Sequence, residues 1–334
     1  MSVAVVILNY NGRKFLSDFL PIVLENTQDA TIYVADNGSS DDSLALLAAD
    51  FPSVSVLSWS ENLGYAGGYN FALGQIKADY FVLMNSDIAP RKNWLTPLET
   101  FFEANPTVAA AQPYLLDFYN PEYFEYAGAA GGFWDSYGYP FCRGRLFDTI
   151  EKREGQYATS IVNWATGACL MVRSDVFHLV GGLDDYLFAH MEEIDLCWRI
   201  QRAGYSIAAV AESEVLHVGG GTLNKENPFK TYLNFRNNLI LLYKNLEPSL
   251  RLKTIFIRMI LDGIAGIKFL TEGKFNSFLA ILKAHYGFYH YIFFVKDKQN
   301  LSPSLQKKSV SSYTGSILKD YFLKGRKKFN QIKF

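Results

Sequence analysis

The chain has 334 residues, of which 49% are hydrophobic and 19% are charged. This composition argues against disorder, and the length suits one large domain or two smaller ones. The three cysteines have no CxxC or CxxH spacing, which argues against a zinc ribbon or a disulfide scaffold and fits a reducing cytosol. The N-terminus lacks the pattern of a signal peptide, and no run of 18 uncharged apolar residues predicts a transmembrane span.

The net charge of −1 conceals a strong division along the chain. Residues 1–230 carry 14 Lys and Arg against 28 Asp and Glu, a net −14, whereas residues 231–334 carry 18 against 5, a net +13. The acidic part argues against a nucleic-acid partner, because its charge would repel phosphate. The division predicts a catalytic part that is followed by a basic C-terminal part.

Strands and helices are predicted to alternate in the first 90 residues. The predicted strands cover residues 3–8, 31–35, 54–59 and 79–84. The predicted helices cover residues 13–25, 41–49 and 69–76. This alternation indicates an open α/β sheet. Ligands bind outside the carboxyl ends of the strands in such sheets, so the turns at Asn9, Asp36, Asn62 and Asp87 are expected to line one pocket.

The rest of the chain is less regular. Residues 114–147 are rich in Gly, Tyr and Phe, which predicts loops and short strands. Residues 161–173 predict a strand pair around Gly167, and residues 207–216 predict a further strand. Residues 231–295 contain long helices that are both apolar and basic, and residues 301–334 form a Ser- and Lys-rich tail.

Asp87 and His217 are candidate metal ligands. Asp87 comes directly after a predicted buried strand, where its carboxylate suits a divalent cation that holds phosphate oxygens, and Asn85 offers a second oxygen on the same side. His217 follows another predicted strand, and an imidazole can complete such a site. Taken alone, Asp87 also fits an Asx turn, and His217 also fits a capping or core position. Each gains weight from the other.

Three carboxylates, Glu192, Glu193 and Asp195, stand at a predicted helix start. Two explanations are equally good. Acidic residues there complement the helix dipole, or one of them is a general base whose pKa is raised by the acidic, partly buried surroundings. The glycine-rich turn at residues 62–68 has neither the GxGxxG nor the P-loop arrangement, which argues against NAD enzymes and P-loop NTPases.

Eight motifs occur in an order that resembles a known enzyme family. They are VVILNYNG (5–12), VADNGSSD (34–41), ENLGYAGGYN (61–70), LMNSD (83–87), WATGACLMVR (164–173), GGLD (181–184), MEEIDLCWR (191–199) and His217. This series, across residues 2–245, resembles the family 2 glycosyltransferases, especially their bacterial rhamnosyltransferase-like branch. The resemblance implies an α/β GT-A nucleotide-diphospho-sugar transferase fold, a Rossmann-like mixed sheet flanked by helices, here with a C-terminal helical extension.

The resemblance also implies a metal-dependent, inverting transfer from a nucleotide-diphospho-sugar to a hydroxyl group. The residues that would bind the nucleotide-sugar are Asn9, Asp36, Asn62, Gly67, Ser86, Asp87 and Arg236. Asp87 and His217 would hold Mn²⁺ or Mg²⁺, with Asn85 standing where the family's Asp-x-Asp motif has its first Asp. Arg236 fits an exposed helix arginine equally well.

Catalytic and acceptor positions follow from the same resemblance. Glu193 stands where the family has its catalytic base, next to Glu192, and the two could exchange roles because Glu is one methylene longer than the family's Asp. The acceptor side would include Trp164, Gly167 and Asp195. Aromatic rings stack well on sugar faces, although core packing explains any single ring as well.

The sequence therefore predicts a catalytic domain in residues 1–235, an amphipathic helical region in residues 236–300 and a basic tail in residues 301–334. The resemblance to the rhamnosyltransferase-like branch implies a deoxythymidine-diphosphate sugar such as rhamnose as the leading donor. The expected acceptor is a glycan or lipid-linked saccharide in cell-surface polysaccharide biosynthesis. The helices and the tail are expected to rest on the anionic inner face of the cytoplasmic membrane, or else to pack on the catalytic domain with a solvated basic face.

Two other functions are considered. A nucleotidyltransferase would use a similar sheet but attack the α-phosphate, and residues 9–13 match its basic glycine-rich loop poorly. A non-catalytic sugar-nucleotide-binding module would keep Asp36 and Asp87 but would need no base.

Overall fold

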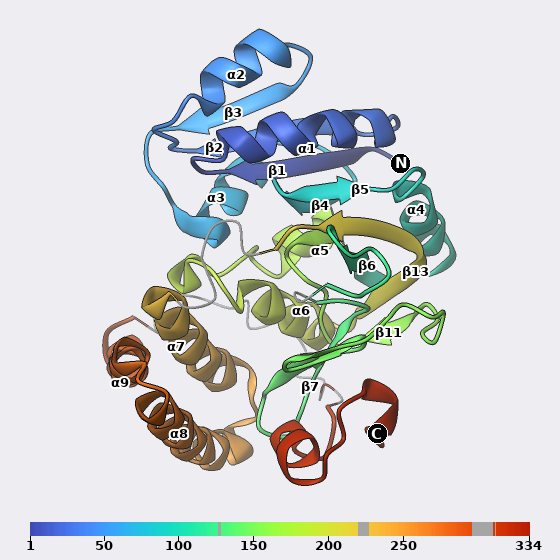
Figure 1. Ribbon diagram of the computed structural model, residues 1–334. Coiled ribbons are helices and arrows are strands. Elements are labelled where there is room, and N and C mark those ends of the chain that lie inside the picture. The colour runs from blue at the N-terminus through green and yellow to red at the C-terminus, as the bar shows by residue number, and fades with distance from the viewer. Residues whose placement is uncertain (126–127, 220–226, 296–309, 311) are drawn as a thin grey trace.

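The computed structural model describes residues 1–125, 128–219, 227–295, 310 and 312–334. Within these residues a nine-stranded mixed sheet has the order β11-β13-β6-β12-β4-β1-β2-β3, and β5 pairs with β13 (Figure 1). Its strands are β1 (Val3–Asn9), β2 (Thr31–Asn37), β3 (Ser55–Trp59), β4 (Tyr80–Asn85), β5 (Ile88–Pro90), β6 (Val108–Asp117), β11 (Ser160–Val162), β12 (Cys169–Arg173) and β13 (Ser206–His217). Strands β1 to β4 are parallel, whereas β12 runs antiparallel to β4 and β6.

Helices cover both faces of this sheet, as expected for an α/β fold (Figure 1). They are α1 (Arg13–Asn26), α2 (Ser43–Asp50), α3 (Gly64–Leu73), α4 (Leu95–Ala104), α5 (Ser174–Leu179), α6 (Glu192–Arg202), α7 (Pro228–Asn245), α8 (Pro248–Thr271) and α9 (Phe275–Phe294). One core cluster joins the sheet to α1, α2 and α4, and the other joins it to α3, α5, α6 and α7. Neighbouring residues Val5 and Val6 of β1 point to opposite clusters, so that strand is buried on both faces.

The four predicted N-terminal strands are confirmed, and so is the strand that ends at His217. The third predicted helix begins earlier than expected, at Gly64 instead of Tyr69. Gly64 has a φ of +74°, a conformation that glycine adopts without strain, and its N–H donates to the Oδ1 atom of Asn62 at 2.8 Å. The glycine-rich turn is therefore the first turn of α3.

A second, four-stranded sheet lies in the region that was predicted as loops and short strands. It has the order β10-β9-β8-β7 and consists of β7 (Gly132–Trp134), β8 (Pro140–Cys142), β9 (Arg145–Leu146) and β10 (Thr149–Ile150). Residues 312–334, red in Figure 1, pack against it. Tyr313, Ile317, Tyr321 and Ile332 are buried there with Phe141 and Leu146.

This packing differs from the predicted tail. Residues 301–309 and 311 lie outside the described residues, but Ile317 N–H donates to Asp135 at 2.9 Å and Tyr313 N–H donates to the Trp134 carbonyl at 2.9 Å. Apolar residues spaced among the lysines bury themselves on the small sheet, while most of the basic side chains stay in water. The segment is thus part of the fold as well as basic.

Helix α7 crosses the predicted domain boundary at residue 235. Its residues Leu239 to Leu242 are buried in the same core cluster as α6. Helices α8 and α9 pack beyond it (Figure 1). Within the described residues, no helix is long and apolar enough to cross a membrane. The three cysteines, Cys142, Cys169 and Cys197, are free thiols and are all buried.

Candidate active site

Asn9 and Asp36 form a pair at the carboxyl ends of β1 and β2. The sheet register places them opposite each other, and the Nδ2 atom of Asn9 donates to Asp36 Oδ2 at 2.9 Å. Both side chains are almost fully buried, and Asp36 also accepts a hydrogen bond from Ser39 N–H at 3.0 Å. The Oδ1 atom of Asn9 has no partner in the described part of the chain. The pair is therefore a fixed, buried unit of one carboxylate and one amide, with one acceptor left unpaired among the described residues.

Asn62 and Gly67 shape the turn beside that pair. Asn62 Oδ1 accepts hydrogen bonds from Asn37 Nδ2 at 3.0 Å and from Gly64 N–H at 2.8 Å. A Cβ atom at Gly67 would lie 2.9 Å from the Leu63 Cβ, so the close packing of α3 requires glycine. Both residues thus fix the backbone geometry of this turn.

Ser86 lies near the same rim, because Gly12 is close to both Asn9 and Ser86. A Cβ atom placed on Gly12 would lie 2.3 Å from Asn9 Oδ1 and 3.7 Å from Ser86 Oγ. Strand β4 neighbours β1, with Asn85 opposite Leu8. The loop that carries Ser86 and Asp87 therefore continues from the end of the central pair of strands.

Asp87 and His217 are brought together, as the sequence predicted. His217 Nε2 lies 3.2 Å from Asp87 Oδ1, and Ile88 pairs with His217 across β5 and β13. Burial acts to raise the pKa of the Asp87 carboxyl, but His217 and the N–H of Gly219 outweigh it and hold that pKa below its usual range. Burial disfavours a charged His217, yet the carboxylates beside it raise the pKa of the imidazole to about 10.

Sequence reasoning missed a second carboxylate at this histidine. Glu125 Oε2 lies 3.2 Å from His217 Nδ1, and the Glu125 side chain is buried. Its N–H donates to the Leu115 carbonyl at 2.9 Å, which fixes the segment beside β6. His217 thus sits between two carboxylates, with Asp87 on its Nε2 side.

The donor set fits a cation that is shared with a phosphate ligand. Among the described residues, no group of three or more His, Cys, Asp or Glu side chains could hold a metal ion on its own. Asp87 can supply a carboxylate oxygen, and His217 can supply a ring nitrogen once it loses the proton that its raised pKa favours. Mg²⁺-like ions in nucleotide sites take one or two carboxylates and complete their shell with phosphate oxygens. The pair is therefore suited to a cation bound together with a diphosphate.

Glu192 and Glu193 open helix α6. Burial, and then the neighbouring Glu193, raises the pKa of Glu192 well above its usual range. Burial raises the pKa of Glu193 to about 7. In each carboxyl group one oxygen lacks a hydrogen-bond partner within the described ranges. A carboxyl group with a pKa near neutrality and a free oxygen can take up a proton at the working pH, as a general base must.

Three sequence motifs come into contact at Gly167: the glycine-rich turn that contains Tyr65, the segment 164–173 and the acidic start of α6. Tyr65 Oη donates to the Gly167 carbonyl at 2.5 Å. A Cβ atom on Gly167 would lie 2.5 Å from that hydroxyl and 3.5 Å from Glu193 Cβ. The neighbouring Ala168 carbonyl accepts a hydrogen bond from Asn85 N–H at 2.9 Å. Tyr65, which the sequence did not single out, therefore connects the first turn of α3 to the surroundings of Glu193.

Arg236 is neither exposed nor free to reach outward, so its interpretation as a surface arginine is wrong. It is 8% exposed and stacks on Tyr186 and Tyr232. Its Nη2 atom donates to the carbonyls of Tyr186 at 3.1 Å and Leu187 at 3.2 Å. The structure places the guanidinium against the segment before Glu192, which differs from the expected contact with the diphosphate.

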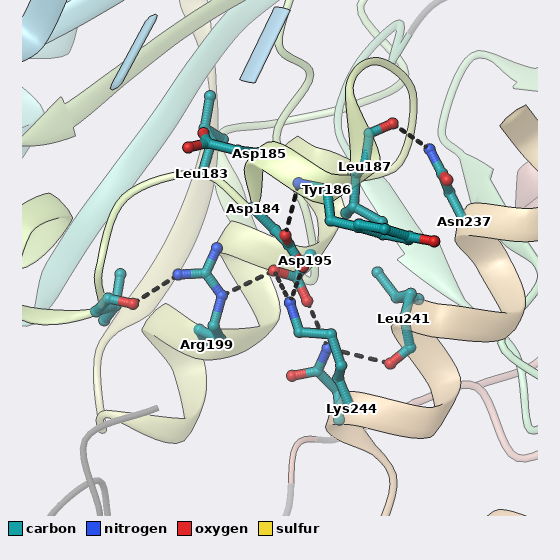
Figure 2. A network of polar contacts seen from close by, with 12 residues as sticks. Leu183, Asp184, Asp185, Tyr186, Leu187, Asp195, Arg199, Asn237, Leu241 and Lys244 are labelled. Atoms are coloured by element: carbon teal, nitrogen blue, oxygen red, sulfur yellow. Dashed lines mark hydrogen bonds and ion pairs between the residues drawn. The ribbon is translucent and has the colours of Figure 1, made fainter. Parts of the chain in front are cut away.

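Asp195 also differs from its expected place on the acceptor side (Figure 2). It is fully buried, its Oδ2 accepts hydrogen bonds from Arg199 at 2.8 Å and Lys244 at 3.0 Å, and its Oδ1 accepts one from Asn245 at 2.8 Å. Burial acts against the charge, but Lys244 and Arg199 hold the pKa of Asp195 far below its usual range. Both oxygens are thus engaged in joining α6 to α7.

Trp164 packs inside the protein as well. It is 7% exposed, its Nε1 donates to the Phe133 carbonyl at 2.8 Å, and its indole lies so close to Gly132 that a side chain there would overlap the ring. Of the three residues expected on the acceptor side, Gly167 lies beside Glu193, whereas the side chains of Trp164 and Asp195 are engaged in contacts elsewhere.

Comparisons with known proteins agree with this geometry. The family model for glycosyl transferase family 2 matches residues 4–178. The chain is 28% identical to an N-acetylglucosaminyl-diphospho-decaprenol L-rhamnosyltransferase of Mycobacterium tuberculosis, over 64% of this chain and 75% of that protein. It is 24% identical to the dTDP-rhamnosyl transferase RfbF of Shigella flexneri, over 73% of this chain and 81% of that protein.

The fold is shared with a solved glycosyltransferase. The crystal structure of GalNAc-T7 with UDP, GalNAc and Mn²⁺ matches with a TM-score of 0.57 and 16% identity, over 72% of this chain. The match spans about half of the GalNAc-T7 chain, 47%. This likeness confirms the predicted GT-A fold. Because the family model covers more than half of the sequence, this protein is a glycosyltransferase that belongs to glycosyl transferase family 2, in a branch with rhamnosyltransferases among its relatives.

Proposed function

We propose that the protein moves a sugar, with rhamnose as the leading candidate, from a nucleotide-diphospho-sugar to a hydroxyl group of a glycan or lipid-linked acceptor. The contacts among Tyr65, Gly167 and Glu193 carry this proposal, because they bring a carboxyl group with a raised pKa to the first turn of α3 and, through the neighbouring Ala168, to the end of β4. The names of two relatives support the choice of sugar, and one of them acts on a lipid diphosphate. Cell-surface polysaccharide biosynthesis is the process that this chemistry serves.

The nucleotide-sugar is proposed to bind at the carboxyl ends of β1, β2 and β4. Asp36 accepts hydrogen bonds from the base or ribose, and the free Oδ1 atom of Asn9 accepts one more. The turn formed by Asn62 and Gly67 covers the nucleoside, with Ser86 and Asp87 on the diphosphate side.

Asp87 and His217 would hold Mn²⁺ or Mg²⁺. When bound, such an ion stabilises the negative charge that develops on the departing nucleotide diphosphate. Glu125 keeps the imidazole in place from the opposite side.

Glu193 is proposed as the base of a single displacement. The acceptor hydroxyl oxygen forms a bond to the anomeric carbon while the bond from that carbon to the phosphate oxygen breaks, and the hydroxyl proton moves to the Glu193 carboxylate. Attack from the face opposite the diphosphate inverts the anomeric configuration. Burial and the neighbouring Glu193 raise the pKa of Glu192 well above its usual range and so favour its protonated form, while Glu193, with a pKa of about 7, can ionise.

Helix α8 supports the proposed peripheral contact with an anionic membrane at the cytoplasmic side. Its charged residues Arg258 and Asp262 point into the protein, where Asp262 lies 3.2 Å from His285 of α9. Its outer face carries two exposed lysines, Lys253 and Lys268, and five apolar residues that are all more than half exposed: Leu252, Phe256, Ile260, Ile264 and Ile267. A helix on the surface of a water-soluble protein has the opposite arrangement, with its apolar side chains toward the core and its charged side chains toward water. Together with the net charge of +13 over residues 231–334, this face suits an interface of anionic lipid.

A transfer assay tests the function directly. The protein is incubated with dTDP-rhamnose or another nucleotide-sugar, a polyprenyl-diphospho-N-acetylglucosamine acceptor and Mn²⁺ or EDTA. The expected result is metal-dependent release of nucleoside diphosphate and an inverted glycosidic linkage in the product by NMR. Release of pyrophosphate in a parallel assay with a nucleoside triphosphate and a sugar 1-phosphate would instead indicate a nucleotidyltransferase. Binding of the nucleotide-sugar without any turnover would indicate a binding module.

A further inference from the structure

The segment that leads into helix α6 has an unusual backbone. Phe188, His190 and Met191 have φ values of +63°, +68° and +73°, in the left-handed region that residues other than glycine rarely adopt. Three such residues within four positions persist only where the surroundings hold them. Glu192 and Glu193 follow at once, so whatever holds this segment also sets where the two carboxyl groups lie.

Asn237 of helix α7 holds the segment by its carbonyl groups. Its Nδ2 atom donates to the carbonyls of Leu187 at 2.8 Å, Ala189 at 2.9 Å and His190 at 2.7 Å. Figure 2 shows the first of these contacts, which reaches from α7 to the loop. Asn237 is fully buried, so water cannot replace its amide if it is lost.

The other carbonyls of the segment are held as well. Arg236 donates to the carbonyls of Tyr186 and Leu187, and Arg236 Nε donates to Asn237 Oδ1 at 2.8 Å, which orients the amide. From the opposite side, the Phe188 carbonyl accepts hydrogen bonds from the N–H groups of Tyr65 at 2.7 Å and Ala66 at 3.2 Å. The segment is therefore clamped between α7 and the first turn of α3, which belongs to the donor pocket.

We propose that Asn237 is a positioning residue of the transferase reaction, which sets the Glu192–Glu193 pair beside Gly167 by holding residues 187–190. This inference rests on the proposed function, because it takes Glu193 to be the base. The proposal makes α7 a helix that positions the catalytic carboxyl groups, although the sequence predicted that the residues from 236 onward form an appended region.

The next residue of the same helix offers a matched control. Asn238 is 2% exposed, and its Nδ2 donates to the Gly138 carbonyl at 3.1 Å, in the loop before β8. Its contact with this segment is a weak one, with the Met191 sulfur at 4.0 Å. Asn238→Leu thus removes a buried amide from α7 but leaves the carbonyls of residues 187–190 bound.

The test compares Asn237→Leu, the milder Asn237→Ser and Asn238→Leu, assayed below their melting temperatures. Both Asn237 variants are expected to lose about 10²-fold in kcat, since a displacement of about 1 Å costs that much, while nucleoside diphosphate affinity stays within about twofold. Their kcat–pH profiles should shift as the surroundings of Glu193 change, and the profile of Asn238→Leu should not. Equal losses of kcat in Asn237 and Asn238 variants, with unchanged profiles, would overturn the proposal.

Hydrogen exchange on the wild-type protein provides a measurement that does not depend on the variants folding. The amides of residues 186–195 should lose protection together with those of α7, because one clamp holds both. Opening of that segment while α7 stays protected would also count against the clamp. Glu193→Gln keeps the two questions apart: if that variant retains turnover, the assignment of the base fails, whatever the Asn237 variants do.

Discussion

The Nε2 atom of His217 lies 3.2 Å from the Oδ1 atom of Asp87, although β13 and β4 are not neighbours in the sheet. Strand β5 explains the contact, because it starts directly after Asp87 and pairs with the end of β13, with Ile88 opposite His217. Backbone pairing thus assembles the two side chains before any ligand binds. Such preassembly would suit the cation that is proposed to be shared with a diphosphate.

Removal of either side chain of this pair should weaken metal binding. Asp87→Ala and His217→Ala are each expected to lower the affinity for Mn²⁺ by about 100-fold or more, because changes to residues just outside a metal's ligands already cost about 10- to 100-fold. The affinity is measured by calorimetry with saturating nucleoside diphosphate. His178→Ala, on the exposed surface of α5, serves as the control. An unchanged affinity in both variants would remove this pair from the metal site.

The turnover number should depend on the ionisation of Glu193. A base must be deprotonated to act, so kcat is expected to rise with pH through about 7 and to fall in more acidic solution, as the raised pKa of Glu193 requires. Glu193→Gln should lower kcat by about 10²- to 10⁴-fold and keep nucleotide binding. A wild-type profile that is flat from pH 5 to pH 8 would contradict the assignment.

A methyl group at residue 167 should disturb catalysis. In Gly167→Ala the new Cβ would lie 2.5 Å from the Tyr65 hydroxyl, so the hydrogen bond to the backbone carbonyl must break or the backbone must move away from Glu193. A fall of about tenfold or more in kcat is expected from such a displacement. Gly263→Ala is the matched variant, since its Cβ has nothing within 4 Å and helix α8 should tolerate it. Equal activity of the two variants would show that the junction at Gly167 does not matter.

The buried ion network between α6 and α7 predicts a large loss of stability. Lys244 Nζ lies 2.6 Å from Asp184 and 3.0 Å from Asp195, and all three side chains are buried (Figure 2). Lys244→Met leaves the negative charges of the two buried carboxylates less compensated. It should lower the free energy of unfolding, measured by denaturant titration, by about 3–5 kcal/mol. Lys268→Met removes an exposed pair with Glu272 and should cost no more than about 1 kcal/mol. Similar losses in both would argue against the network.

The apolar face of α8 should bind lipid. Phe256→Glu combined with Ile260→Glu is expected to abolish co-sedimentation with vesicles rich in phosphatidylglycerol, because a carboxylate is repelled by an anionic surface and costly to bury there. Leu179→Glu changes an exposed apolar residue of α5 and should leave vesicle binding intact. If the wild type does not bind at low salt, where the electrostatic attraction is strongest, the membrane proposal fails.

Local patterns sufficed to predict the N-terminal part of the fold, where the donor is proposed to bind. Strands β1 and β4 are continuous apolar runs because both faces are buried, and polar residues stand at or just after the ends of β1, β2 and β4, so Asn9, Asp36 and Asp87 could be identified from their neighbours alone. The contact of Asp87 with His217 followed from two strand ends and from the resemblance to a family. These features all depend on short stretches of chain.

The remaining features depend on contacts between distant segments, which a single sequence does not reveal. Glu125 lies in a stretch without periodicity, and its place at His217 follows from the position of the segment beside β6. Asp195 could not be told apart from Glu193 by spacing, because its burial is decided by Lys244 on another helix. The hydrogen bonds from Asn237 to three carbonyls likewise require the left-handed backbone conformations in residues 188–191, which no sequence motif predicts.

The burial of all three cysteines has a practical consequence for spectroscopy. Burial raises the pKa of Cys142 to about 11 and that of Cys197 to about 12, and it also raises the pKa of Cys169, so the native protein offers few thiolates to a maleimide or a spin label. A single cysteine introduced on the outer face of α8 would therefore be modified selectively in the otherwise unaltered chain. Fluorescent or paramagnetic reporters could then follow that helix as lipid is added, without prior removal of the native thiols.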